Sequence, residues 1–239
     1  MIEGFLGLSV AAFLAGLVRG FSGFGTAMVF LPIAGQILTP FQAVTAMIVM
    51  DAIGPLPNVP RALKVAHRGD ILRLALGYLI VMPLGVWVLL SIGSEGFRYG
   101  VSALTFGMLV ILLLGIRYRG AVTRALVYGI GGLAGLSGVA AGLAGPPVIL
   151  FYMASAHSAQ VIRANILLFL LVTDVLLLGA FWVSGKMVVS ALLTGLALVP
   201  IYGLANLAGA AIFRPGAERT YRAVAYFIIA AAALSGLPL

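Results

Sequence analysis

The chain has 239 residues, of which 63% are hydrophobic and only 8% are charged. Soluble domains carry about 25% charged residues, so this composition excludes a soluble globular protein and leaves no room for a separate catalytic domain. The absence of cysteine excludes disulfides, thiolate chemistry and cysteine-bound metals. The net charge of +8 does not indicate a nucleic-acid partner, because the basic residues lie in short loops between apolar runs.

Ten apolar segments follow one another along the chain, several of them about 20 residues long, which predicts an all-α polytopic membrane protein. A transmembrane β-barrel would need alternating strands of about 10 residues, and the sequence lacks them. We expect a single transmembrane domain over residues 1–239, embedded in the lipid bilayer of the cell (inner) membrane. The segments span residues 4–18, 26–38, 41–59, 71–90, 97–116, 122–136, 146–156, 161–183, 188–213 and 221–237.

A glycine-rich stretch at residues 16–26 returns in altered form at residues 135–145, about 119 residues later. Each stretch lies near the start of its half of the chain, between two apolar segments. We therefore predict two repeats of about five segments each, over residues 1–119 and 120–239, with a short broken helix in each. The identical pairs at this offset are Ala15 and Ala134, Gly16 and Gly135, Leu17 and Leu136, Gly23 and Gly142, Val29 and Val148, and Leu31 and Leu150.

The basic residues predict how the segments cross the membrane. If every segment crosses, twelve of the fourteen lysines and arginines fall on one side, and only Arg98 and Lys186 fall on the other. Because basic loops favour the cytoplasm, both termini are expected outside. With five segments per half, the second half enters from the opposite side, which is the inverted-topology repeat of many secondary transporters. The alternative is a simple helix bundle with accidental internal similarity.

The second segment and its counterpart at residues 146–156 are too short to cross a membrane. About 13 residues at about 1.5 Å each reach about 20 Å, against a hydrocarbon core of about 30 Å. Each is therefore expected to begin near the midplane, where Pro146 and Pro147 suit a first helical turn. In inverted repeats the two helix starts face each other, and helix N-termini attract anions. The alternative is that the glycines only permit close helix packing.

Side chains and backbone around these two helix starts form the predicted substrate site. Arginine suits planar oxyanions through its fork of donors, and serine and threonine add hydroxyl donors. For Arg19, an anchoring role at a helix end explains the residue equally well. For Asn165, hydrogen bonding between helices explains the residue as well as substrate contact does. The predicted substrate-binding residues are Arg19, Ser22, Gly23, Gly25, Thr26, Ser137, Gly142, Gly145 and Asn165.

Two carboxyl groups, Asp51 and Asp174, lie near the middle of the third segment of each half. A carboxylate in mid-membrane costs several kcal/mol unless it is neutralised or paired, so we predict that these two residues carry protons during transport. The structural alternative is that each caps a helix end or pairs with Arg19 or Arg163. Their separation of about 123 residues differs from the repeat offset by about four, so they are not expected to be symmetry mates.

The remaining titratable residues give no sign of enzymatic chemistry. Membrane enzymes usually gather histidines, carboxylates or a nucleophile and its base, whereas this chain has six scattered acidic residues and two histidines. We expect no catalytic residue, no cofactor and no metal site, because His67 and His157 are far apart in the sequence. Asp70 is expected to be the N-cap of the fourth segment.

The glycine patterns resemble those of the sulfite exporter TauE/SafE family of membrane permeases. The resemblance rests on residues 16–25 followed by a short segment ending near Pro32, and on the basic loop 61–73 leading into Pro83 and Gly85. In the second half it rests on residues 135–147 and on Arg163 and Asn165, so it covers essentially the whole chain. The resemblance implies secondary transport of sulfite, thiosulfate or organosulfonates. The chain departs from the plainest family pattern at Arg19, Phe21, Pro146 and Pro147.

The sequence therefore favours a secondary transporter of small sulfur-containing anions, coupled to protons through Asp51 or Asp174. A passive anion channel and a transporter of another small organic anion are the alternatives. A structural or assembly subunit would not need broken helices. The expected partners are a sulfur oxyanion or sulfonate and the lipid bilayer. The sequence is compatible with a homo-oligomer.

Overall fold

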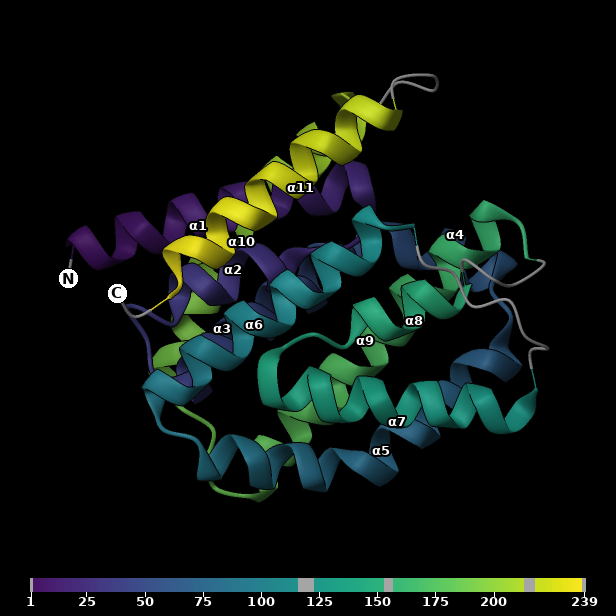
Figure 1. Ribbon diagram of the computed structural model, residues 1–239, viewed down its shortest axis with the longest axis horizontal. Helices are drawn as coiled ribbons and strands as arrows, with labels where there is room; N and C mark the ends of the chain where they lie inside the picture. Colours follow the sequence, from purple (N-terminus) through teal and green to yellow (C-terminus); the bar gives the residue numbers. More distant parts are fainter. Residues whose placement is uncertain (1, 116–122, 153–156, 213–217, 238–239) are drawn as a thin grey trace.

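The computed structural model describes residues 2–115, 123–152, 157–212 and 218–237, and within these ranges it contains helices and no strand. The all-α prediction is confirmed (Figure 1). The helices are α1 (Ile2–Ser22), α2 (Thr26–Ala34), α3 (Pro40–Ile53), the 3₁₀ turn η1 (Leu56–Asn58), α4 (Val59–Val65), α5 (Arg68–Ser91), α6 (Ser94–Leu113), α7 (Arg124–Ala141), α8 (Gly145–Tyr152), α9 (Ala159–Val183), α10 (Val189–Ile212) and α11 (Glu218–Ser235).

Six stretches of the described chain are long and apolar enough to cross a membrane, which confirms a multi-pass membrane protein. One of them, Pro40–Val65, joins α3, η1 and α4. The sequence prediction placed a single segment at residues 41–59 and missed the break that separates α3 from α4. Pro40 opens this stretch, and Pro55, Pro57 and Pro60 lie at the break between α3 and α4. Proline removes a backbone donor from a helix.

The two short helices lie at the centre of the molecule, as their apolar sequences require. α2 has nine residues and buries eight of them, and α8 has eight residues and buries seven. At about 1.5 Å per residue each is about 12–14 Å long, less than half of a hydrocarbon core. The long helices around them turn large apolar side chains outward, among them Ile80, Val183 and Phe227. An apolar exterior around a buried centre is what contact with lipid requires.

Two close helix pairs enclose this centre, α1 with α10 and α5 with α7. Figure 1 shows the first pair together with α11 on one side of the molecule and the second pair on the opposite side. Glycines allow the backbones to approach: a Cβ added to Gly16 of α1 would lie 2.5 Å from the Tyr202 carbonyl oxygen of α10. A Cβ added to Gly135 of α7 would lie 2.6 Å from the Tyr78 carbonyl oxygen of α5. The pair of glycines matched in the sequence thus makes the same kind of contact in both helix pairs.

The prediction that Asp70 caps α5 is wrong. The helix begins at Arg68 with His67 as its N-cap residue, and Asp70 lies in the first turn. The carboxylate of Asp70 contacts side chains instead of free backbone N–H groups: Arg73 donates to its Oδ1, and His67 and His157 lie against its Oδ2. Because His157 belongs to the other half of the chain, local sequence did not reveal this arrangement.

Candidate functional site

The first helix break lies between α1 and α2. Gly23 and Gly25 have φ angles of +81° and +101°, a left-handed region that favours glycine. The Ser22 hydroxyl lies 2.6 Å from the Val18 carbonyl oxygen and accepts the N–H of Phe24 at 3.2 Å. Ser22 therefore holds the end of α1 in shape, and α2 starts again at Thr26.

The second break, between α7 and α8, has the same design. Gly142 has a φ angle of +70°, and the Ser137 hydroxyl lies 2.9 Å from the carbonyl oxygens of both Leu133 and Leu143. A Cβ added to Gly142 would overlap the side chain of Leu31 in α2. The two broken elements therefore pack directly against each other.

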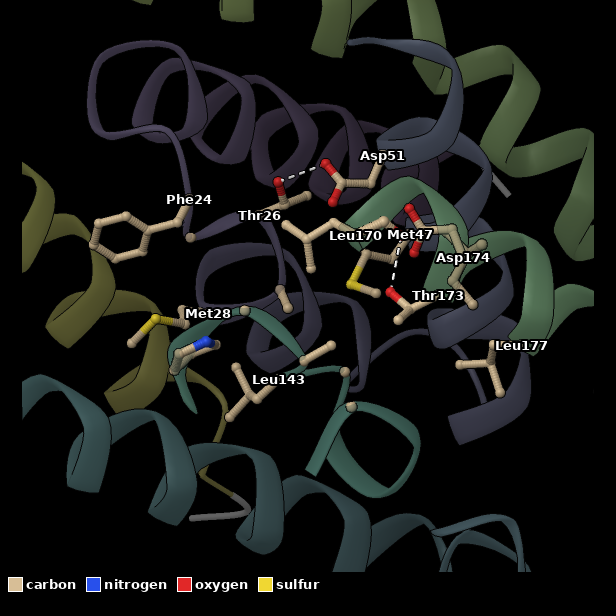
Figure 2. Close-up of a pocket in the computed structure, with 18 of the residues that line it drawn as sticks. Phe24, Thr26, Met28, Met47, Asp51, Leu143, Leu170, Thr173, Asp174 and Leu177 are labelled. Atoms are coloured by element: carbon tan, nitrogen blue, oxygen red, sulfur yellow. Dashed lines mark hydrogen bonds between the residues drawn. The ribbon is translucent and has the colours of Figure 1, made fainter. Parts of the chain in front are cut away.

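A cavity of about 40 Å³ lies between the two breaks (Figure 2). It is lined by the starts of both short helices, including Gly25, Thr26 and Gly145, and by residues of α3, α5 and α9. The first N–H groups of a helix have no acceptor within the helix, and they give its start a positive partial charge. Two such starts on one cavity favour a negatively charged group there.

The charged group nearest the first break is an ion pair between Arg19 and Asp51. Arg19 Nη1 lies 3.3 Å from Asp51 Oδ2, and both side chains are buried. The other carboxylate oxygen, Oδ1, accepts a hydrogen bond from the Tyr202 hydroxyl at 2.6 Å and one from the Thr26 hydroxyl at 3.0 Å. Both oxygens of Asp51 are therefore occupied, as a buried carboxylate requires.

Asp174, on α9, differs from Asp51 because one of its oxygens has no partner. It lines the same cavity and is buried, and within the described chain its Oδ2 makes no hydrogen bond. The neighbouring Thr173 hydroxyl donates to the Leu170 carbonyl at 2.8 Å. Figure 2 shows Asp51 and Asp174 beside the same pocket. A buried polar atom without a hydrogen bond is costly, and Asp174 Oδ2 is a carboxyl oxygen on this cavity that lacks a donor within the described chain.

The structure brings most of the predicted site residues together. Ser22, Gly23 and Ser137 lie at the breaks but do not line the cavity. Asn165 lies elsewhere: its Oδ1 accepts the backbone N–H of His67 at 2.7 Å, and its Nδ2 donates to the Tyr152 hydroxyl at 3.0 Å. Substrate binding by any of these residues stays a prediction. The predicted residues that line the cavity are Arg19, Gly25, Thr26, Gly142, Gly145, Asp51 and Asp174.

Two tyrosines were missed by the sequence analysis. Tyr202 of α10 donates to Asp51, and Tyr78 of α5 lines the cavity. Both are buried near the middle of an apolar helix, about 124 residues apart. Their position is the signal that was available, since a tyrosine far from a segment end is not part of an interfacial belt.

Discontinuous helices that meet at a buried, charged cavity are typical of membrane transport proteins. The family model for the sulfite exporter TauE/SafE matches residues 8–236. The chain therefore belongs to the TauE/SafE family of membrane transporters, as its glycine patterns predicted. No curated protein and no solved structure matches the chain.

Proposed function

We propose that the protein is a secondary transporter that carries a small sulfur-containing anion, such as sulfite, thiosulfate or an organosulfonate, through the central cavity. The observation that carries the proposal is the convergence of two helix starts and the buried Arg19 on one cavity. Helix starts and a guanidinium are the donors that proteins use for oxyanions. The family supports a sulfur anion as the substrate class.

The volume of the cavity favours a compact ligand. One water needs about 10–15 Å³ of such volume, so about 40 Å³ has room for about three water-sized groups. The oxygens of a sulfite or of a sulfonate head group match this size, whereas an organic tail requires the cavity to open. The anion would accept hydrogen bonds from the free backbone N–H groups at the starts of α2 and α8.

The charges around the cavity support coupling to protons. Arg19 and Asp51 balance each other, so an ionised Asp174 would give the cavity a net negative charge that repels an anion. Asp174 lines the same cavity as Arg19 and Asp51, so the charges of these groups act on it. We infer that the anion binds together with a proton on Asp174, and that Arg19 turns partly from Asp51 to the anion. This arrangement produces anion–proton symport.

Alternating access to this cavity needs two halves that move against each other, and we propose the inverted repeats 1–119 and 120–239 for this role. The helix pairs α1 with α10 and α5 with α7 correspond to each other at the repeat offset, as do the contacts of Gly16 and Gly135, which supports the repeat symmetry. Asp51 and Asp174 are not equivalent within it. α3 and α9 start about 119 residues apart, whereas Asp174 lies about one helical turn farther along its helix than Asp51.

We also propose that the termini lie outside and that the basic loops face the cytoplasm of the cell membrane. The start of α1 and the end of α11 lie at the same end of the molecule, opposite α4 (Figure 1). Arg98, one of two basic residues assigned to the outer side, donates hydrogen bonds to the carbonyls of Gly236 and Leu237 after α11. Its charge therefore has a structural role at the C-terminal end of that helix.

The proposal is tested by flux into liposomes that contain the purified protein, comparing sulfite, thiosulfate, taurine, sulfoacetate and chloride with and without a proton gradient. We expect one or more sulfur anions to accumulate against their gradient when protons flow inward. Equal downhill leakage of all five solutes would indicate a channel. Absence of flux for every sulfur compound would overturn the substrate class.

A further inference from the structure

The two histidines of the chain, expected to lie apart, come together at the junction of α4 and α5. His67 lies just before α5, Asp70 lies in its first turn, and His157 lies just before α9. Asp70 Oδ2 is 3.2 Å from His67 Nδ1 and 3.3 Å from His157 Nε2. The centroids of the two imidazole rings are 5.4 Å apart. The three side chains therefore converge from both halves of the chain.

We propose that His67, Asp70 and His157 bind one divalent transition-metal ion of the Zn²⁺ type. In a tetrahedral site with metal–ligand bonds of about 2.0–2.1 Å, neighbouring ligand atoms lie about 3.3 Å apart. The two distances from Asp70 Oδ2 match this spacing, and all three ligand atoms lie within 4.8 Å of one another. The two histidine nitrogens lie within 4.8 Å of each other, and rotation of the exposed His67 side chain can bring them to the tetrahedral spacing. Imidazole and carboxylate ligands suit zinc and its neighbours.

The surroundings of the cluster hold its ligands in place. Arg73 Nη1 donates to Asp70 Oδ1 at 3.1 Å, which orients the carboxylate so that Oδ2 faces the histidines. The fully buried Asn165 accepts the backbone N–H of His67 and donates to Tyr152, which fixes the His67 backbone to α9. Such outer contacts usually support metal ligands. These hydrogen bonds place Asn165 beside the histidine cluster and not in the central cavity.

The exposure of the cluster fits an exchangeable ion. Asp70 is nearly buried, whereas the side chains of His67 and His157 are 51% and 33% exposed. This leaves an open side for the ion to enter and for water to complete its coordination. The Arg73 guanidinium repels a cation, so we expect micromolar rather than nanomolar affinity. A bound ion would connect the start of α5 to the start of α9 and so stabilise the folded protein by mass action.

The test uses the full-length protein with any affinity tag removed, stripped with a chelator and titrated with Zn²⁺ by calorimetry and with Cu²⁺ by electron paramagnetic resonance. The chain has two histidines and no cysteine, so a signal from two imidazole nitrogens on one copper ion identifies this pair. We expect one ion per chain. In His157→Gln and in Asp70→Asn the affinity should fall at least about tenfold. Glu95→Gln, which removes an exposed acidic group at the start of α6, should leave the affinity unchanged.

Failure of the wild-type protein to bind Zn²⁺ at submillimolar concentration would overturn the proposal, as would a copper spectrum without two imidazole ligands. Undiminished affinity in both variants would do the same. The wild-type spectrum decides the question even if a variant does not fold. None of these readouts is flux, so the result is independent of the proposed transport activity.

Discussion

Arg19 and Asp51 form a buried ion pair that joins the end of α1 to α3, with Arg19 Nη1 3.3 Å from Asp51 Oδ2. The pair lies on the central cavity, beside the start of α2. Its position has two consequences: it neutralises a carboxylate at membrane depth, and it places a guanidinium where the proposed substrate anion would bind. The first consequence concerns stability, and the second concerns transport.

A double-mutant experiment distinguishes the effect of the ion pair on stability from its effect on transport. Asp51→Leu alone leaves an unpaired buried guanidinium and should cost about 3–5 kcal/mol of folding free energy. The double variant Arg19→Leu, Asp51→Leu removes both charges and should be more stable than either single variant, yet it should carry no sulfur anion. Thermal unfolding in detergent and liposome flux measure the two properties. Flux at the wild-type rate in the double variant would exclude Arg19 from the transport site.

The hydroxyl of Tyr202 should matter more than that of Tyr78. Tyr202→Phe removes the 2.6 Å hydrogen bond to Asp51, and hydrogen bonds to charged groups contribute about 1.5–3 kcal/mol. Tyr78→Phe is the matched control, since the described structure shows no hydrogen bond for that hydroxyl. We expect a lower melting temperature for the first variant only, measured by thermal unfolding in detergent. Equal effects would show that Asp51 does not depend on Tyr202.

The glycines of the first and second breaks should respond differently to alanine. Gly23 and Gly142 both have a positive φ, for which a non-glycine residue costs about 1–2 kcal/mol. A Cβ at Gly23 has open space, whereas one at Gly142 overlaps Leu31. Gly142→Ala should therefore lower both the melting temperature and the flux strongly, and Gly23→Ala only mildly. A larger loss in Gly23→Ala would contradict the close packing of the two breaks.

Much of the fold was predictable because the lipid bilayer restricts which backbone structures can span it. Every backbone group must be satisfied in the bilayer, so apolar runs become helices. Each predicted segment overlaps an observed helix, whereas α4 lies mostly in the predicted basic loop 61–73. The short helices were predictable from their length, and α8 begins at Gly145, one residue before the predicted start at Pro146. The break between α3 and α4 was missed because the apolar run continues through it.

The site was predictable only where local sequence determines it. The glycines of the breaks and the mid-segment carboxylates can be identified from their residue type and their position in the sequence. The partners of those groups cannot be identified in this way. Tyr202 donates to Asp51 from a helix about 150 residues later. Asn165 accepts the backbone N–H of His67 and does not line the central cavity. Likewise, the cluster of His67 and His157 exists only because tertiary packing joins the two halves. Contacts of this kind depend on packing that periodicity cannot show.

Asp174 is the proposed proton carrier, because its Oδ2 makes no hydrogen bond within the described chain. The most direct test compares wild type with Asp174→Asn in liposomes, using whichever sulfur anion the wild type accumulates. Two modes are measured: exchange of labelled for unlabelled anion, and uphill accumulation driven by a proton gradient. Thr173→Ala is the control, since that hydroxyl donates to the Leu170 carbonyl. We expect Asp174→Asn to keep exchange and to lose uphill accumulation, whereas Thr173→Ala keeps both. Proton-driven accumulation by Asp174→Asn would contradict this role, as would the loss of exchange in a folded variant.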